Sequence, residues 1–400
     1  MPNIQEPGRI LTNFGLYSRC EKNLDTRIIN TSEKTRKKCR ILYLVGQLGP
    51  GGLERQLVGL LEVMNRGECS PLVVVWNFQG NDTYVRPIQK LGVEVVALPR
   101  NLSPFGKLWQ FGQLAKELNP EVIHSYSFYT NFAAYWGGLL TGAVAVGALQ
   151  SDFITEKKVS GVVLGRLSAL FPKVHISNNS LAAENVRKAV GIFLPKKVVV
   201  VRNGLDLKIF RNCDFPTFQK VSILAVGSLL PVKRWDRLLR ASAELKRMGY
   251  DFVVRLVGGG PLRSSLEEQA QSLGLVDSFE FLGHRSDIPA LLADSLFLVH
   301  TSDREGCPNV ITEAMACGRA VVATNVGEVP MLIEDGKTGY VVGRDEPENL
   351  INRMKILIID QELCRRMGKA GRFKAEKEFG VDRLLSETLA VYRTAGWRMN

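Results

Sequence analysis

Two glutamates eight positions apart, Glu305 and Glu313, lie in the segment of this 400-residue sequence that is richest in groups able to bind a ligand. An apolar run ends at His300, a polar loop with Glu305 follows, and Pro308 is well placed as the first residue of a helix that carries Glu313. A single carboxylate is more often a solvated surface group or a helix cap. Two of them beside one helix start could accept hydrogen bonds from hydroxyl groups, one set from a sugar and the other from a ribose.

The start of that helix is itself a candidate site for phosphate. Backbone N–H groups in a first helical turn have no partner within the helix, and the helix dipole makes this end positive. Both effects favour bound phosphate. The residues that would bring their backbone to this place are Gly306, Cys307, Asn309 and Val310. The segment therefore predicts a diphosphate held between the two glutamates.

Lys233 is the second candidate group, because it follows a strand-like run over residues 221–227 and precedes an amphipathic helix. A lysine near a helix start is unfavourable with the helix dipole, so its position needs another reason. A compact positive charge at a strand end could bind a phosphate in a cleft. We expect Lys233 to be such a catalytic group, with Arg234 and the preceding Ser228 as further ligand contacts.

Glycine-rich turns after other strand-like runs could let the backbone approach a ligand closely. The first-half turn holds Gly51 and Gly52, and in the second half Gly259 is the middle one of three consecutive glycines. Such glycines also serve simple close packing of a strand and a helix. His284 follows a later run at the corresponding place, where it could edge a nucleobase or be an ordinary surface residue. Glu54 is interpreted as a first-turn helix acid rather than a ligand.

His124 is one of four histidines and lies near the end of a short apolar run, residues 122–125. Ligands of open parallel sheets bind beyond the carboxyl ends of the strands. We expect His124 to face the cleft as a substrate contact and candidate catalytic residue. A structural histidine with a satisfied hydrogen bond is the alternative.

The elements that position these residues are short apolar runs separated by amphipathic stretches. Unbroken Val, Ile and Leu runs joined by helices are typical of a parallel sheet covered on both faces. A first series of predicted strands comprises residues 41–46, 72–76, 93–98, 122–125, 143–149, 174–177 and 198–201. A second series comprises residues 221–227, 252–257, 279–282, 296–300, 320–323 and 340–342. The pattern predicts an α/β protein with two doubly wound, Rossmann-like domains that face an interdomain cleft.

The chain length agrees with this organisation, because 400 residues exceed what one hydrophobic core usually supports. We predict a flexible basic tail over 1–38, an N-terminal domain over 39–203, a C-terminal domain over 204–380 and a last helix within 381–400. Seven widely spread cysteines without a C-x-x-C pair argue against a disulfide framework and a structural zinc site. We therefore expect no metal and a reducing, cytoplasmic setting.

The net charge is +12, and residues 1–40 contribute +5 of it, with nine Lys and Arg against four Asp and Glu. Such a run is usually a solvated, mobile lead-in. The functional alternative is attraction to phosphorylated substrates or to an anionic membrane, which would place the protein peripherally on the inner face of the plasma membrane. We expect no nucleic-acid partner, because no recognition motif accompanies the charge. We also expect neither a signal peptide nor a membrane-spanning segment, because residues 1–40 are polar and the most apolar stretch, residues 139–149, is too short to span a bilayer.

Taken together and in this order, the motifs of residues 40–395 resemble retaining glycosyltransferase family four, which has the GT-B fold. Each motif alone is weak, and the whole series is specific. The motifs are Gly51-Gly52-Leu53-Glu54, Asn203-Gly204-Leu205-Asp206 with Phe210, Val226-Gly227-Ser228-Leu229 with Lys233, Leu256 to Leu262, Phe281-Leu282-Gly283, the Glu-x7-Glu pair with Glu313 to Gly318, and Val326 to Pro330.

The resemblance implies a role for each part of the chain. Glu305 and the amides after Gly306 would hold the donor sugar, Glu313 the ribose, and Lys233 the diphosphate. The C-terminal domain would bind a nucleotide diphosphate sugar as co-substrate without a further cofactor, and the N-terminal domain would bind the acceptor. The last helix would cross back to the N-terminal domain. The family retains anomeric configuration without a metal.

Two positions depart from the family pattern. The family often has arginine where this chain has Ser228, and often a second histidine where it has Tyr126. We therefore predict a retaining, metal-independent hexosyltransferase that uses a UDP- or GDP-sugar and a glycan, lipid-linked or small-molecule acceptor, in cell-surface polysaccharide or glycolipid synthesis. The alternatives are a nucleotide-sugar 2-epimerase and a catalytically silent sugar-nucleotide-binding subunit.

Overall fold

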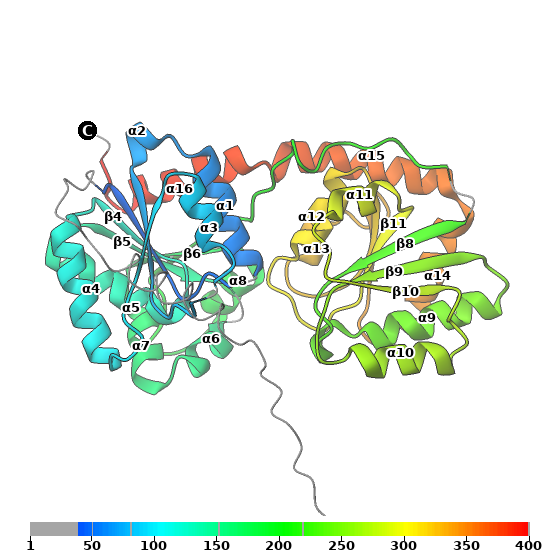
Figure 1. Cartoon of the computed structure of the whole chain (residues 1–400), viewed down its shortest axis with the longest axis horizontal. Helices are drawn as coiled ribbons and strands as arrows, with labels where there is room; N and C mark the ends of the chain where they lie inside the picture. Colours follow the sequence, from blue (N-terminus) through cyan, green and yellow to red (C-terminus); the bar gives the residue numbers. More distant parts are fainter. Residues whose placement is uncertain (1–38, 50, 81, 151–152, 218–219, 399–400) are drawn as a thin grey trace, which may run out of the picture.

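The computed structural model describes residues 39–49, 51–80, 82–150, 153–217 and 220–398, which form two α/β domains side by side (Figure 1). The predicted basic tail over 1–38 lies outside the described residues. Each domain is built on one parallel sheet. The prediction of two Rossmann-like domains is therefore confirmed.

The N-terminal domain has a seven-stranded sheet of order β3-β2-β1-β4-β5-β6-β7. Its strands are β1 (Ile41–Val45), β2 (Pro71–Val75), β3 (Glu94–Ala97), β4 (Val122–Ser125), β5 (Val144–Leu149), β6 (Val174–Ser177) and β7 (Lys197–Val200). Its helices are α1 (Gly52–Val63), α2 (Arg66–Cys69), α3 (Val85–Lys90), α4 (Pro104–Leu118), α5 (Asn131–Thr141), α6 (Phe153–Val159), α7 (Val162–Leu170) and α8 (Ser180–Lys188), with the 3-10 turn η1 (Phe128–Thr130).

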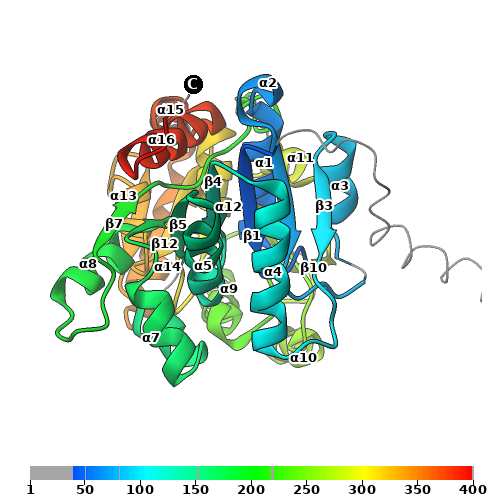
Figure 2. The same ribbon diagram turned by 90° about the vertical axis from the view of Figure 1, so that its left-hand side faces the viewer.

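Both faces of this sheet are covered, which explains why its strands are apolar without interruption. Leu42 and Leu44 of β1 pack in one cluster with α4 and α5, which cover the face seen in Figure 2. The alternate residues Ile41, Tyr43 and Val45 pack in a second cluster with α1 and α3. The strand period of two thus divides one strand between two cores.

The C-terminal domain has a six-stranded sheet of order β10-β9-β8-β11-β12-β13. Its strands are β8 (Val221–Val226), β9 (Phe252–Val257), β10 (Phe279–Gly283), β11 (Phe297–His300), β12 (Ala320–Thr324) and β13 (Gly339–Val342). Its helices are α9 (Trp235–Arg247), α10 (Arg263–Ser272), α11 (Ile288–Ala293), α12 (Asn309–Ala316), α13 (Val329–Leu332), α14 (Pro347–Ile359) and α15 (Gln361–Glu378), with the 3-10 turn η2 (Pro231–Lys233). Predicted and observed strands differ only at their ends.

The last helix, α16 (Val381–Thr394), lies on the N-terminal domain, although it follows α15 of the C-terminal domain (Figure 1). Leu384, Val391 and Tyr392 are buried in the same cluster as Leu57 and Leu60 of α1. The chain therefore passes between the domains twice, once after β7 and once between α15 and α16. No helix within the described part of the chain is long and apolar enough to cross a membrane.

Candidate active site between the two domains

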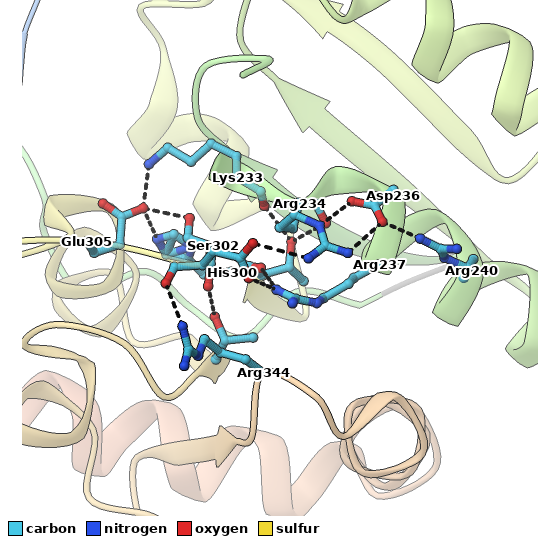
Figure 3. Close-up of polar contacts among 12 residues, drawn as sticks. Lys233, Arg234, Asp236, Arg237, Arg240, His300, Ser302, Glu305 and Arg344 are labelled. Atoms are coloured by element: carbon cyan, nitrogen blue, oxygen red, sulfur yellow. Dashed lines mark hydrogen bonds and ion pairs between the residues drawn. The ribbon is translucent and has the colours of Figure 1, made fainter. Parts of the chain in front are cut away.

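The ends of β8 and β11 bring Lys233 and Glu305 together. These strands are parallel neighbours, so the segments that follow them meet at one edge of the sheet. Lys233 ends the turn η2 after β8, and Glu305 lies in the loop after β11. Lys233 Nζ donates a hydrogen bond to Glu305 Oε1 at 2.6 Å (Figure 3). The two side chains are 20% and 14% exposed, so the pair is largely shielded from water.

Two further residues of this cluster, Ser302 and His300, were not predicted as site residues. Ser302 Oγ donates to the same Glu305 Oε1 at 2.6 Å, and His300 Nε2 lies 3.1 Å from it (Figure 3). Burial lowers the pKa of His300 to about 4, so its imidazole is neutral at neutral pH. The signal for both residues was their place at the end of a buried strand, a few positions before Glu305. Among the described residues, the recorded contacts of this carboxylate fall on Oε1.

Arg234, a predicted phosphate contact, is engaged by carboxylates. Its backbone is left-handed, with φ at 51°, and its guanidinium donates to both oxygens of Asp236 at 2.9 and 3.0 Å and to Asp303 Oδ2 at 3.1 Å (Figure 3). Arg237 also pairs with Asp303, at 2.7 Å. Burial opposes the ionised form of Asp303, but hydrogen bonds from Arg237 and Arg234 hold its pKa below the usual range. The sequence prediction for Arg234 overlooked these two carboxylates.

The helix after Glu305 begins one residue later than predicted. Pro308 has ψ at 104°, which is extended backbone, so α12 begins at Asn309 with Pro308 in the cap position. Within the described residues no side chain caps this helix start. The predicted residues Cys307 and Val310 flank this start, and burial raises the pKa of the Cys307 thiol to about 12. The thiol is therefore neutral at physiological pH.

Glu313 is buried within α12 and contacts the other domain. Its carboxylate forms an ion pair with Arg55 Nη2 of α1, and its side chain is 3% exposed against 43% for Arg55. Burial raises the pKa of Glu313, and the positive charge of Arg55 opposes this rise. The sequence predicted Glu313 as a ligand contact but gave no indication of Arg55.

Asn309, at the start of α12, joins the two domains through polar contacts. Its Oδ1 accepts hydrogen bonds from Asn203 Nδ2 at 2.7 Å and Gln56 Nε2 at 3.4 Å. Gln56 in turn accepts from the backbone of Gly204 at 2.8 Å. A Cβ at Gly52 would lie 2.9 Å from Asn309 Nδ2. Two predicted ligand-binding positions, Gly52 and Asn309, are thus in contact with each other.

Glu328 makes the other polar bridge between the domains, and it too escaped prediction as a site residue. Its carboxylate is fully buried and accepts from the backbone and hydroxyl of Ser180 at 2.6 and 2.7 Å and from Arg202 Nε at 2.7 Å. Its own backbone N–H donates to the carbonyl of Gly306 at 3.0 Å. Glu328 therefore links the Glu305 loop to the first turn of α8.

A cavity of about 740 Å³ lies beside these bridges and is lined by both domains. The N-terminal domain contributes residues of α6 and α8, including Thr155, Ser180 and Leu181. The C-terminal domain contributes residues 303–306 and 325–327. Of the predicted site residues, Glu305 and Gly306 line this cavity. A cavity of this size suits a small molecule of several ring systems.

The glycine-rich turns mainly pack against one another. The carbonyl of Ser228 accepts from Trp235 Nε1 at 3.0 Å, and the carbonyl of Gly259 accepts from Leu229 N at 2.9 Å. A Cβ at Gly259 would meet no atom within 4 Å, so this position is open. His284 is exposed beyond the end of β10. Within the described part of the chain, neither Gly259 nor His284 forms a hydrogen bond or ion pair with Lys233, Ser302 or Glu305.

An acidic side chain, that of Glu54, lies beside the first residues of α1. Gly51 is its cap residue, and a Cβ there would lie 2.1 Å from an oxygen of Glu54. This geometry agrees with the interpretation of Glu54 as a first-turn acid. Burial raises the pKa of the Glu54 carboxyl.

The prediction that His124 faces the cleft is wrong. Its side chain is 3% exposed, and its Nδ1 lies 2.7 Å from the hydroxyl of Tyr392 in α16. Burial lowers its pKa to about 3. Tyr126, the family departure, is also buried and packs against the rings of His124 and Tyr43. Because α16 covers this part of the sheet, His124 is a structural residue beneath a helix.

Comparisons with known proteins identify the domain that carries the cluster. Residues 216–374 match the model of the family described as glycosyl transferases, group 1. The chain is 27% identical over 205 residues to N-acetyl-alpha-D-glucosaminyl L-malate synthase of Bacillus anthracis, which is 49% of this chain and 54% of that protein. It is 26% identical over 303 residues to alpha-maltose-1-phosphate synthase of Mycolicibacterium smegmatis, which is 68% of this chain and 78% of that protein. The chain spans about half the length of most curated relatives that it matches.

Solved structures agree on the fold. The crystal structure of Anabaena HepE in complex with UDP superposes with a TM-score of 0.76 at 22% identity, covering 89% of this chain and 100% of that one. The superposition includes both domains, so the pairing of two parallel-sheet domains is shared as well as each sheet. The C-terminal domain therefore matches the group 1 glycosyltransferase family, and the two Rossmann-like domains have the GT-B arrangement.

Proposed function

We propose that this protein transfers a hexosyl-type sugar from a nucleotide diphosphate sugar to an acceptor hydroxyl, with retention of the anomeric configuration. The observation that carries the proposal is the Lys233–Glu305 pair, held at 2.6 Å beside the interdomain cavity and the uncapped start of α12. A cation and a helix start attract a diphosphate, and a carboxylate binds sugar hydroxyls.

In the proposed complex each group of the cluster has one task. Lys233 and the first amides of α12 stabilise the diphosphate and the negative charge that develops on it as it leaves. Glu305 binds hydroxyls of the donor sugar, because its recorded protein contacts fall on Oε1 and its Oε2 is left for a ligand. Glu313 binds the ribose. Arg234, Ser228, Gly259 and His284 lie on the nucleotide side as secondary contacts.

The proposed reaction breaks the bond between the anomeric carbon and the diphosphate oxygen and forms a bond from the acceptor oxygen on the same face. The acceptor proton passes to the leaving phosphate oxygen, so the products are the glycoside and a nucleoside diphosphate. This route asks no side chain to act as the general base. It also needs no metal ion, because Lys233 and α12 supply the positive charge.

The names of related proteins support a nucleotide donor. HepE has been crystallised with UDP and with UDP and glucose, and a mannosyltransferase relative is named as GDP-mannose-dependent. We therefore propose a UDP- or GDP-sugar donor. The acceptor, a glycan, lipid-linked or small molecule, would enter from the N-terminal side of the cavity, where α6 and α8 line it.

A Glu305→Gln variant tests this assignment. It removes the charge while keeping size, so we expect transfer to fall by about 100-fold or more, since Glu305 both orients Lys233 and holds the sugar. Glu334→Gln is the matched control, because Glu334 also pairs with lysines but is 41% exposed on the surface. An unchanged rate in Glu305→Gln, with the variant folded, would overturn the site assignment.

The reaction type is tested separately by product analysis with wild-type protein. Donor incubated without acceptor should give at most slow hydrolysis, and an epimerised nucleotide sugar would instead show a 2-epimerase. Anomeric configuration is read by NMR of the transferred sugar, and a chelator such as EDTA should leave the rate unchanged. Nucleotide binding without turnover across an acceptor panel would identify a silent binding subunit.

A further inference from the structure

The N-terminal domain presents a short helical hairpin made of α6 and α7. Gly161, at φ 82°, turns the chain between the two helices. A Cβ at Gly165 would lie 2.2 Å from the carbonyl of Lys157, so the two helices approach to backbone contact there. Only glycine permits that approach. The hairpin is therefore a compact unit with a fixed tip.

The tip of this hairpin is apolar and faces water. Val159, Val162 and Val163 are 82%, 70% and 71% exposed, and Ile154 on α6 is 66% exposed. Isolated exposed apolar residues are common, but neighbouring ones at the tip of a rigid hairpin mark an interaction surface.

A second apolar loop lies against the same hairpin. Its Phe193 ring is contacted by Lys157 Nζ at 5.9 Å and by the guanidinium of Arg166 at 5.0 Å, one from each helix. These contacts hold the loop, in which Val190 is fully exposed and Ile192 is 81% exposed. We call the hairpin tip, with Val159, Val162 and Val163, and residues 190–192 together the apolar rim.

The segment that carries the apolar rim is strongly basic. Residues 153–197 contain eight Lys and Arg against two Glu, a net charge of +6 that is half of the +12 of the whole chain. The basic residues are Lys157, Lys158, Arg166, Lys173, Arg187, Lys188, Lys196 and Lys197. All of them except the half-buried Lys157 are exposed. Apolar side chains among exposed cations are the pattern of a surface that binds anionic lipid, since the chains enter the interface and the cations meet the headgroups.

We propose that the apolar rim, together with the exposed cations of residues 153–197, docks the N-terminal domain on an anionic lipid bilayer. A second copy of the chain is the less suitable occupant, because a symmetric contact would bring one +6 surface against another. The consequence for the acceptor rests on the proposed function. The α6 helix of the hairpin also lines the cavity through Thr155, so a docked domain would receive a lipid-linked acceptor directly from the membrane surface.

Vesicle co-sedimentation of the 400-residue chain tests the docking surface. Vesicles of phosphatidylglycerol and phosphatidylcholine in equal parts should bind the protein, and vesicles of phosphatidylcholine alone should bind it far less. In the double variant Val162→Asp with Val163→Asp, the partition coefficient should fall by about tenfold or more, because two apolar anchors become anions. In the double variant Lys158→Glu with Lys196→Glu, the partition coefficient should fall by about fivefold for each of the two lysine charges lost.

Matched control variants carry their changes in the C-terminal domain. All proteins compared keep residues 1–38, so the basic tail contributes equally to each. Val276→Asp, at a position 67% exposed, controls for the tip change, and Lys369→Glu controls for charge reversal. Both should bind vesicles like wild type. Equal vesicle binding by the tip variant and wild type would overturn the proposal. A dimer in light scattering without lipid that the tip variant dissociates would also overturn it, by showing a protein interface.

A further comparison separates this proposal from the proposed function. Glu305→Gln should bind vesicles like wild type, because Glu305 lies outside the rim. The tip variant should keep donor turnover with a water-soluble acceptor and lose it selectively with an acceptor embedded in vesicles. If Glu305→Gln left turnover unchanged, the proposed function would fail while the vesicle result still stood on its own.

Discussion

Replacing Lys233 by methionine should remove a single charge from the centre of the proposed donor site. Methionine keeps most of the apolar stem, so the change removes mainly the ammonium group that lies 2.6 Å from Glu305 Oε1. In the proposed reaction this ammonium stabilises the leaving diphosphate. Removal of one preorganised donor to developing negative charge costs about 2.7–4 kcal/mol of activation free energy. The expected fall in kcat/KM is therefore about 10²- to 10³-fold.

The measurement is the initial rate of nucleoside diphosphate release at fixed acceptor, over a range of donor concentrations. Lys337→Met is the matched control, because Lys337 pairs with Glu334 at 2.7 Å in the same domain but is 69% exposed. Its loss should change the rate little, since an exposed ion pair contributes at most about 1 kcal/mol. A folded Lys233→Met protein that worked within about threefold of wild type would refute the assignment of Lys233 to the diphosphate.

Three other perturbations follow from the site and its surroundings. Arg55→Met should lower the free energy of unfolding in urea by about 1–3 kcal/mol, because the buried carboxylate of Glu313 loses its ion-pair partner. An unchanged free energy of unfolding would show that the pair does not form in solution. Glu328→Gln should lower the unfolding midpoint and loosen the domains, detected as faster proteolysis between them, whereas an unchanged digest would argue against an interdomain bridge. His124 has a folded pKa of about 3, below its unfolded value near 6.5, so its contribution to stability is complete above pH 6.5 and is lost as the pH falls toward 3. His124→Asn should flatten the loss of stability over that range in thermal unfolding and keep turnover near the wild-type rate at neutral pH; a large loss of turnover would return His124 to the catalytic residues.

The fold was predictable because parallel strands buried on both faces leave a strong local signal. Residues 122–125, 174–177 and 252–257 were predicted with the observed bounds, and the other strands differ only at their ends. The sequence also placed Lys233 and Glu305 at strand ends beside one predicted donor site, but it did not predict the hydrogen bond between them. Local pattern and topology were enough to place both residues near one edge of the sheet, because each lies in the segment that follows its own strand.

The partners of the site residues were not predictable from the same signals. Periodicity reports which face of an element is buried, but not which distant element covers it. Arg55 is 258 positions from Glu313, and no feature of α1 singles it out. His124 failed for the same reason, since its neighbour Tyr392 belongs to a helix 268 positions later that returns from the other domain. The prediction for His124 failed because it depended on a helix far away in the sequence, not because histidine is an unsuitable residue type for a site.

Elements of the proposed donor site also make polar contacts between the two domains. Donor binding and the arrangement of the domains are therefore linked. Glu313 and Asn309 of α12 bond to Arg55 and Gln56 of α1, while Glu328 bonds both to α8 and to the backbone of the Glu305 loop. A rotation of one domain against the other must therefore move the start of α12 or break these bonds. Moreover, Glu313 can accept hydrogen bonds from a ribose only where Arg55 leaves room on its carboxylate. Donor binding and the spacing of the domains consequently depend on the same few side chains, so a ligand at α12 shifts the position of the N-terminal domain to the extent that it binds one arrangement more tightly than another.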